Sequence, residues 1–411
     1  MTFNKAIVPA AETREEEFTV DELFISRTDK RGVIQSGNEV FRRVSGFEWD
    51  RLVGSPHKIV RNPDMPKAVF WLLWKTIQSG NPMVVYVKNL SASGRWYWVL
   101  AVVVPLADGY LSAHIKPTSP LFAQTKLLYA EILEAEATLL PEKSAELLLS
   151  RLAAMGFANY PEYAARVLEM ELASRDLALG NTNATGTKFL GSVGSSLKAM
   201  NEKQADLMRE FEALQSIPTN MRIIASRLEP SGGPISAISD NYKYASSEVS
   251  RRLEEFAGSE NNLCQSMSQI VRDGLFLSAI SRLMAQVQTY LSSEDNSAAV
   301  VDFNAERTSF AQVAAQFRQK AQAVMHNAEF ASGELNIASG EIRRMMLGLD
   351  TIRVMGRVES GRLGAVGIGL AATIDQLDTR HASISNLLQN LMDLSAIIKT
   401  GIKTYQRHAG I

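Results

Sequence analysis

The placement of tryptophan divides this chain into two regions of different composition. All five tryptophans lie in the first quarter of the 411 residues, and none follows Trp98. Beyond Ser119–Pro120 the sequence is dominated by Ala, Leu, Ser, Glu and Arg. Aromatic and β-branched residues favour sheet, whereas the later composition favours helix. A chain of this length exceeds one compact core. We therefore predict a mixed α/β domain followed by a long helical region.

The first region has the pattern of an antiparallel sheet with helices inserted after its second strand. Asn38 is a helix-capping residue for a short helix that ends at Gly46. Apolar residues at helical spacing predict a longer helix over Met65–Ser79. The five predicted strands are Glu22–Thr28, Gly32–Ser36, Met83–Lys88, Arg95–Val104 and Gly109–Lys116.

Both faces of this sheet are expected to be covered. Val99, Ala101 and Val103 alternate along one strand with Trp98, Leu100 and Val102, so each face is apolar. One cover is a ligand pocket with its helices. For the other we expect the segment before Asp21, the Leu121–Leu140 helix or a second subunit.

The loop Ser55–Pro66 reads Ser-Pro-His-Lys-Ile-Val-Arg-Asn-Pro-Asp-Met-Pro. It resembles the PAS domain of bacterial aerotaxis receptors, in which a Pro-His-x-x-Val-Arg-x-Pro-Asp-Met-Pro loop borders a flavin pocket. The resemblance covers about residues 20–117. It implies an α+β PAS domain with a five-stranded antiparallel sheet, a bound FAD and a role in sensing redox state or oxygen.

By this resemblance, Arg61, Asn62 and Asp64 occupy positions needed for FAD binding. The residues themselves offer further parts of a flavin site, which needs an apolar slot, hydrogen-bond donors and a cation for the phosphate tail. Asn38 stands on the preceding helix, and an apolar wall is expected from Trp71, Trp74, Val85 and Val87. Two positions depart from the family pattern, since the family commonly has His in place of Asn62 and Trp in place of Met83.

Other readings of this domain stay open. Arg-Asn-Pro-Asp is good turn chemistry by itself, so a PAS domain without a cofactor is the alternative. For haem, the ligand candidates are His57 and His114, although each is more often a hydrogen-bonded structural histidine.

The helical region contains a weak internal repeat. Residues 219–229 and 350–359 align on Glu229 and Glu359, and each segment passes through glycine into a second helix. These two hairpins resemble, in degenerate form, the tips of methyl-accepting chemotaxis receptors. The resemblance implies contact with the chemotaxis kinase or its coupling protein, although Pro230 interrupts the first tip.

Long helices with apolar seams of the coiled-coil type bury those seams only against partners. We expect a homodimer that forms a four-helix bundle, with one chain folding back on itself as the alternative. The expected divisions are an N-terminal extension (1–19), the PAS domain (20–118), a helical connector (119–180), a linker (181–196), a first hairpin (197–260), a helical region (261–345) and a second hairpin (346–411).

Several classes of function find no support in the sequence. The net charge of −1 gives no basic field for nucleic acid, and no nucleotide-binding, nucleophile or metal motif is present. His381 lacks the glycine motifs of a histidine kinase after it. The single Cys264 fits a reducing compartment.

The apolar run Val99–Leu106 is too short to span a membrane. We therefore expect a cytoplasmic, non-enzymatic sensor without a membrane anchor, which relays a flavin signal through its helical hairpins. The alternative is a cofactor-free PAS scaffold for dimerisation or protein contacts.

Overall fold

The computed structural model describes residues 14–181, 185–228, 232–258, 262–293, 303–364 and 368–409. The chain forms two compact units. The first, here called the sheet unit, comprises residues 1–187 and 272–321, and the second, the bundle unit, comprises residues 188–271 and 322–411. The expected division kept 261–345 as one helical region, whereas the structure groups residues 272–321 with the sheet.

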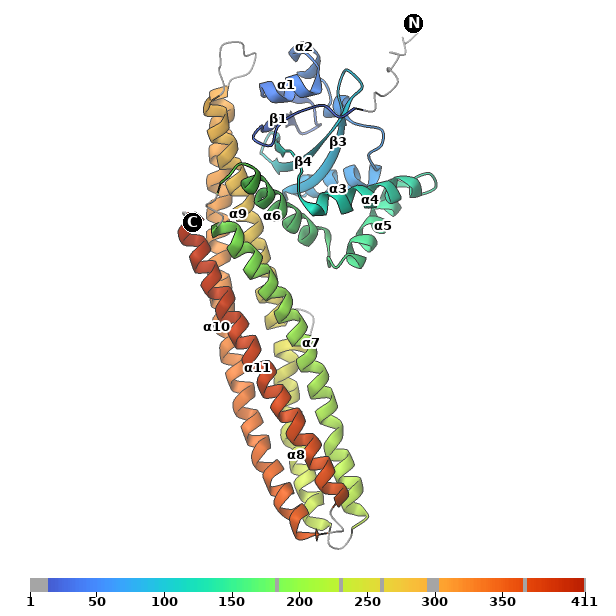
Figure 1. Ribbon diagram of the computed structural model, residues 1–411, viewed down its shortest axis with the longest axis vertical. Coiled ribbons are helices and arrows are strands. Elements are labelled where there is room, and N and C mark those ends of the chain that lie inside the picture. Colours follow the sequence, from blue (N-terminus) through green and yellow to red (C-terminus); the bar gives the residue numbers. More distant parts are fainter. Residues whose placement is uncertain are drawn as a thin grey trace. The chain divides into compact units, whose positions relative to one another are not determined.

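The sheet unit is built on a five-stranded antiparallel sheet in the order β2-β1-β5-β4-β3 (Figure 1). Helices α1, α2 and α3 and the 3-10 turn η1 lie between the second and third strands. In chain order the elements are β1 (Phe24–Asp29), β2 (Ile34–Gly37), α1 (Glu39–Ser45), α2 (Trp49–Leu52), η1 (His57–Val60), α3 (Lys67–Gln78), β3 (Met83–Leu90), β4 (Trp96–Pro105) and β5 (Gly109–Ile115).

These elements confirm the predicted fold class. The Asn38 side chain accepts a hydrogen bond from the Phe41 N–H and so caps α1. The helix ends at Gly46, whose φ of 68° is the left-handed conformation that glycine adopts without a Cβ clash. Local capping chemistry therefore sets the two ends of this short helix.

The two faces of the sheet have different covers. On one face, Tyr86 and Trp98 pack against Phe122 of α4 (Pro120–Ala135), with ring centroids 5.1 and 5.3 Å apart. The Tyr160 hydroxyl of α6 (Tyr160–Ala178) donates to the Val84 carbonyl at 3.1 Å. Helix α5 (Pro141–Ala154) packs against α3. The expected Leu121–Leu140 cover is therefore present as α4, and α6 extends it.

Two later helices complete this outer cover. The apolar core of the sheet includes Ile280 and Leu283 of α9 (Leu263–Ser293) and Phe310 and Phe317 of α10 (Phe303–Arg362). These residues follow the strands by more than 150 positions. Neither helix was among the segments expected to cover the sheet. The apolar face of a helix shows that it will be buried but does not identify the surface against which it packs.

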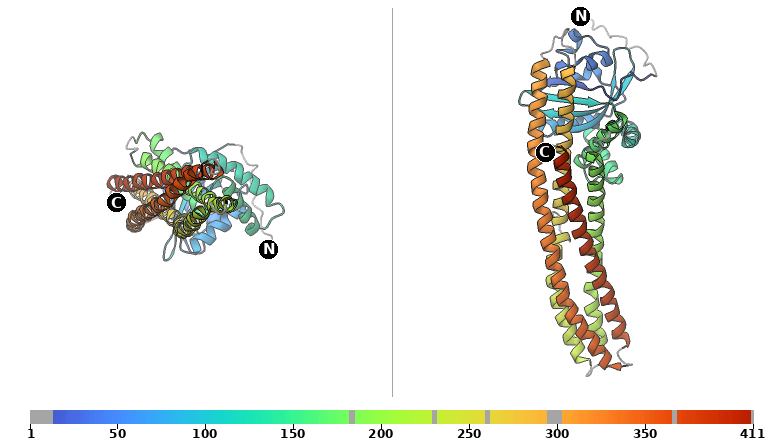
Figure 2. Two further views of the ribbon diagram at one scale, coloured as in Figure 1. Left: turned by 90° about the horizontal axis from the view of Figure 1, so that it is seen from below. Right: turned by 60° about the vertical axis from the view of Figure 1, so that its left-hand side comes forward.

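The bundle unit consists of two helical hairpins from one chain. Helix α7 (Thr185–Ser226) pairs with α8 (Gly233–Leu253), which is followed by the π-helical turn η2 (Glu254–Gly258). Helix α10 pairs with α11 (Ile368–Ala409). The hairpins lie side by side in every view (Figures 1 and 2). Both expected tips fall partly on residues 229–231 and 365–367, outside the described residues, and so does Pro230.

All four long helices meet around Gly356 of α10. A methyl group added there would lie 3.6 Å from Met221 of α7, and 3.7 Å from both Ile238 of α8 and Ile374 of α11. A single chain therefore supplies the four helices of the bundle, as in the alternative that the sequence left open. None of the helices within the described residues is both long and apolar enough to cross a membrane.

The two hairpins repeat the same burial pattern at a spacing of 135 residues. The Arg222–Asp240 ion pair of the first hairpin corresponds to Arg357–Asp375 of the second (357 − 222 = 375 − 240 = 135). Buried positions of α8 recur in α11 at the same spacing: Ile235, Ile238, Ser239, Tyr242, Ser246, Val249 and Leu253 against Leu370, Thr373, Ile374, Leu377, His381, Ile384 and Leu388.

The sequence alignment placed the repeat at 130 residues (359 − 229), five fewer than the structure does. It had matched charged residues such as Arg227 and Arg357, which are exposed. Exposed charges place little constraint on helix register, whereas the buried seam fixes it.

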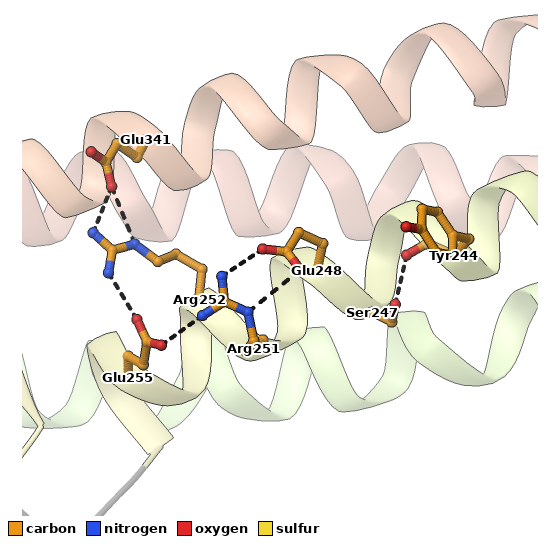
Figure 3. A network of polar contacts seen from close by, with 7 residues as sticks. All are labelled: Tyr244, Ser247, Glu248, Arg251, Arg252, Glu255 and Glu341. Atoms are coloured by element: carbon orange, nitrogen blue, oxygen red, sulfur yellow. Dashed lines mark hydrogen bonds and ion pairs between the residues drawn. The ribbon is translucent and has the colours of Figure 1, made fainter.

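The bundle surface carries a network of ion pairs (Figure 3). Arg252 of α8 binds Glu341 of α10 at 2.6 Å and Glu255 of η2 at 2.8 Å. Arg251 binds Glu248 at 2.6 Å and Glu255 at 2.8 Å. Because these groups are partly exposed to solvent, each ion pair contributes only about 0–1 kcal/mol to the free energy of unfolding.

Candidate functional site: a cavity under the sheet

A cavity of about 260 Å³ lies between α3, the η1 segment and the face of the sheet opposite α4 and α6. This volume is close to the lower end of the range for ligand pockets, about 300–1,000 Å³. Its lining residues are Thr28, Arg31, Gly32, Pro56, His57, Lys58, Arg61, Phe70, Leu73, Trp74, Ile77, Val85, Val87, Asn89, Ala101, Val103, Tyr110, Ser112 and His114.

Two simple periodicities build the cavity wall. Helix α3 contributes Phe70, Leu73, Trp74 and Ile77, the i, i+3, i+4, i+7 set that shares one helix face. The strands contribute alternate residues, such as Tyr110, Ser112 and His114 of β5. The wall is therefore mostly apolar, with polar groups concentrated on β5 and in the η1 segment.

Trp74 closes one side of the cavity. Its ring meets Tyr110 edge-on, with the centroids 5.6 Å apart. A Cβ atom at Gly32 would lie 2.8 Å from the Trp74 ring, and Gly32 has a φ of 77°. The β1–β2 turn therefore requires glycine both for its backbone and for the tryptophan beside it.

Arg61 lines the cavity as a half-buried cation without a direct ion pair among the described residues, although the Glu136 carboxylate lies close enough to act on it. Its guanidinium lies 3.6 Å from the centroid of the Phe70 ring, a cation–π contact. It forms no hydrogen bond or ion pair with the side chains that the structure describes. Burial lowers the pKa of Arg61, and the Glu136 carboxylate partly offsets this shift. Glu136 itself accepts hydrogen bonds from the Lys67 and Ala68 N–H groups at 2.8 and 2.7 Å.

The other predicted site residues lie outside the cavity lining. Asn62 is buried, accepts from the Asp64 N–H at 2.9 Å and donates to the Asn89 carbonyl at 3.4 Å. The Asp64 carboxylate is exposed and pairs with Lys88 at 2.6 Å. These two residues hold the loop that carries Arg61 against β3.

Asn38 and Met83 are both buried away from the cavity lining. Besides capping α1, Asn38 accepts from the Ile25 N–H at 3.1 Å and donates to the Leu23 carbonyl at 2.8 Å. Met83 begins β3 opposite Val103. Of the expected apolar wall, Trp74, Val85 and Val87 line the cavity, and Trp71 does not.

His57 and His114, considered from the sequence only as haem ligands, both line the cavity. Their rings stack with centroids 6.3 Å apart. Burial lowers the pKa of His57 to about 4 and that of His114 to about 3. Residues 57 positions apart become neighbours through the sheet register, a relation for which the sequence gives no local signal.

The electrostatics of the cavity favour an anionic ligand group. Arg31, Lys58 and Arg61 are among its lining residues, and none of those lining residues is a carboxylate. Arg31 is 82% exposed and pairs with Asp29 at 2.9 Å. A phosphate placed at this side would meet three cations, although Asp29 already pairs with Arg31 and Glu136 acts on Arg61.

Comparison with known proteins agrees with the fold. Residues 35–110 match a family model described as the PAS fold. Over 114 residues, 26% of this chain, the sequence is 39% identical to the aerotaxis receptor of Escherichia coli (strain K12). The match spans 22% of that receptor's length, so the chain covers about a fifth of this curated relative.

Two solved structures are among the matches found by comparison of folds. One is the LOV domain of a blue-light-activated histidine kinase from Erythrobacter litoralis EL346, which is 18% identical with a TM-score of 0.21 over 22% of this chain and 90% of that one. The other is the light state of the Aureochrome1 LOV domain, 19% identical with a TM-score of 0.23 over 26% and 88% of the two chains. The PAS domain is identified from the two sequence matches and from the observed five-stranded sheet. The chain contains a PAS domain that resembles that of the aerotaxis receptor.

Proposed function

We propose that this PAS domain binds a flavin, most simply FAD, and that the chain is a non-enzymatic, cytoplasmic sensor of redox state or oxygen. The observation that carries the proposal is the cavity itself, an apolar slot with the half-buried Arg61 among its lining residues. A flavin, when bound, supplies reversible electron transfer coupled to proton uptake.

The residues take different roles in this proposal. Arg61 and Lys58, which line the cavity, would hold the phosphate tail, and Trp74, Val85 and Val103 of the same lining would pack on the ring system. Asn62 and Asp64 act as positioning residues, because they hold the Arg61 loop against β3. Asn38 fixes α1 to β1, and Met83 packs under the cavity wall at the start of β3.

Strand β1 offers a route from the cavity to a long helix. Ser26 and Thr28 face the cavity side, where the Ser26 hydroxyl lies 3.1 Å from Nε2 of His57. Arg27 lies between them in sequence and contacts α10 instead. Its guanidinium donates to the Ser309 hydroxyl at 3.2 Å and lies 3.8 Å from the Glu306 carboxylate. The Ser36 hydroxyl of β2 donates to the same carboxylate at 2.6 Å.

Helix α10 extends from this contact into the bundle unit, since the boundary between the units falls within it. We infer that changes at the cavity reach α10 through β1 and Glu306. A homodimer, and contact with a chemotaxis kinase or coupling protein, remain predictions. Because one chain already completes the four-helix bundle, a dimer must use another surface.

The proposal is tested by the flavin-to-protein ratio of the full-length protein after gel filtration. Arg61→Ala is expected to lower this ratio at least fivefold, because the phosphate loses its buried cation. Arg43→Ala is a matched control, since Arg43 is an arginine of the same domain that does not line the cavity. A folded Arg61→Ala protein with an unchanged ratio contradicts the assignment.

A cofactor-free scaffold is the second candidate. It is favoured by the modest cavity volume, about 260 Å³, and by the partners that Asn38, Asn62 and Asp64 already have within the protein. If the wild-type protein stays colourless after incubation with FAD, the cofactor-free scaffold is supported and the flavin proposal is contradicted.

A further inference from the structure

Within the bundle unit, helix α10 exposes an apolar strip on its outer face, here called the α10 strip. It consists of every seventh residue from Phe330 to Val358 and every seventh residue from Gly333 to Gly361. Successive members are three and four residues apart, the spacing of a coiled-coil seam. Five members are large apolar side chains that are 51–68% exposed: Phe330, Ile337, Leu347, Val354 and Val358. The strip is separate from the buried seam of the same helix, which includes Leu335, Ile342 and Leu349.

The repeat provides a comparison within the same bundle. Each position of the strip corresponds to a position of α7 that lies 135 residues earlier and is also exposed. On α7 these positions carry mainly polar side chains, such as Lys198, Glu202, Glu212 and Thr219, and Ile223 is the one large apolar residue among them. Because both helices have the same place in the repeated hairpin, the fold of the bundle does not require this face to be apolar. The α10 strip therefore indicates a contact with another molecule.

The length of the strip limits what can cover it. From Phe330 to Val358 it spans four heptads (358 − 330 = 28 residues), or about 42 Å at the helical rise of 1.5 Å per residue. A partner must supply a helix with an apolar strip of the same length and spacing. Among the described residues of the bundle unit, α7, α8 and α11 each expose at most two large apolar side chains. The α10 helix of a second copy supplies such a strip.

Large and small residues complement each other when two copies of the strip run antiparallel. With a two-fold axis between residues 345 and 346, Phe330 lies opposite Gly361 and Val358 lies opposite Gly333 (330 + 361 = 358 + 333 = 691). A Cβ atom at either glycine would meet nothing within 4 Å, so contacts inside the chain do not require glycine there. A parallel pair would instead place Phe330 against Phe330 and glycine against glycine, which fills space less evenly.

The charges beside the strip favour the same orientation. Glu329, Glu334 and Glu341 lie beside its first half, and Arg357 and Arg362 lie beside its end. An antiparallel copy places the acidic half of one strip along the basic end of the other. Both arginines also pair with acids of their own chain, so these charges influence the orientation of the partner more than the affinity.

We propose that the α10 strip is the contact surface for a second copy of this chain, which binds antiparallel through the same strip as a two-stranded coiled coil. Such a contact is isologous, since one surface serves both copies. Arg344, the charged member of the strip, falls next to the two-fold axis, where its stem covers apolar surface and its guanidinium reaches solvent. The contact uses only residues of the bundle unit and does not depend on the proposed flavin site.

The first test is the oligomeric state of the full-length protein, measured by analytical ultracentrifugation across micromolar concentrations. Wild type is expected to form a dimer. Val354→Glu should raise its dissociation constant about tenfold or more, because a charge replaces an apolar contact at the interface. Thr219→Glu is the matched control, since Thr219 is the equivalent exposed residue of α7 (354 − 135 = 219), and its dissociation constant should equal that of wild type. Both positions are exposed, so helix content by circular dichroism should be unchanged in both variants.

The second test is the orientation of the two copies. In the antiparallel register Ile337 lies opposite Val354 (337 + 354 = 691). Ile337→Cys and Val354→Cys proteins are treated with a short bis-maleimide cross-linker, each alone and mixed in equal amounts. The native Cys264 is buried and does not compete. Cross-linked dimers should form in the mixture and not with either variant alone.

Each opposite result overturns the proposal. Wild-type protein that stays monomeric refutes it, and so does a Val354→Glu dimer that is as tight as wild type. Equal weakening by Thr219→Glu shows that the contact is not specific to the α10 strip. Cross-linking of either cysteine variant alone, with no increase in the mixture, refutes the antiparallel arrangement. None of these outcomes alters the flavin-to-protein ratio by which the proposed function is tested.

Discussion

Two buried histidines show how differently the two units use polar groups. In the bundle unit, His381 of α11 has both ring nitrogens occupied, Nε2 by the Tyr242 hydroxyl of α8 and Nδ1 by the Asp350 carboxylate of α10 at 2.6 Å. In the sheet unit, the His114 ring is held by stacking on His57 and by the backbone of Phe24 in the neighbouring strand. The side-chain network around His381 ties three helices into one register. The His114 ring depends instead on packing against its neighbours.

The largest expected effect comes from breaking the saturated network. His381→Leu leaves the buried Tyr242 hydroxyl without its partner and removes one of the two partners of the Asp350 carboxylate, which keeps Arg353 at 3.2 Å, at a cost of about 3 kcal/mol. His114→Phe should cost less, about 1 kcal/mol, since it keeps a ring that can stack on His57 and loses only the contact with the Phe24 backbone. Circular dichroism follows the bundle, and tryptophan fluorescence follows the sheet unit alone, because all five tryptophans lie there.

Arg252→Ala is the control for the bundle. It removes the partly exposed ion pairs of Figure 3 and should cost less than about 1 kcal/mol. If His381→Leu and Arg252→Ala lower the free energy of unfolding equally, the buried network around His381 does not stabilise the bundle more than the exposed ion pairs do.

The stability of the sheet unit is expected to depend on pH through its two buried histidines. The pKa values of His57 and His114 are about 4 and 3 in the folded protein and about 6.5 in the unfolded chain. The unfolded chain therefore binds more protons between these values, and stability falls as the pH drops below about 6.5. We expect a loss of about 2 kcal/mol, roughly half from each imidazole, between pH 7 and about pH 5.7, measured by tryptophan fluorescence during urea unfolding.

The double variant His57→Phe/His114→Phe serves as the reference for this pH dependence. Its stability should change less with pH over the same interval. If its pH dependence equals that of wild type, other groups titrate and the two imidazoles are not the cause.

A smaller effect is expected where the sheet meets α10. Glu306 is 5% exposed, and one of its carboxylate oxygens is held by Ser36 while the other is buried without a partner. Glu306→Ala should cost about 1 kcal/mol, the net value of one hydrogen bond. Hydrogen exchange should rise in residues 303–321 and in β1. If hydrogen exchange in β1 is unchanged in this variant, β1 is not coupled to α10 through Glu306. That result contradicts the inferred route from the cavity to α10.

Much of the fold follows from local chemistry in the sequence. Asn38 and Gly46 delimit α1 as expected, and apolar spacing located α3 to within two residues of its start. The aromatic-rich region became the sheet, and the region without tryptophan became helices. Capping, turn and periodicity signals act over a few residues, so a single sequence reveals them.

The candidate site was only partly visible. The loop pattern identified Arg61, and helical spacing identified Trp74, and both line the cavity. Asn62 instead satisfies the backbone of its own turn, which residue type alone does not distinguish from a ligand contact. The place of His114 depends on its pairing with Phe24, across 90 residues (114 − 24).

The sequence by itself determined the elements, their order and the division of the chain into a sheet-forming and a helix-forming part. The tertiary structure decided which surfaces meet. It brought α9 and α10 onto the sheet, set the hairpin repeat at 135 residues (375 − 240) and stacked two histidines from distant segments on the wall of one cavity. The physical reason is that local signals fix backbone conformation, whereas burial depends on contacts between distant segments whose partners no short pattern names.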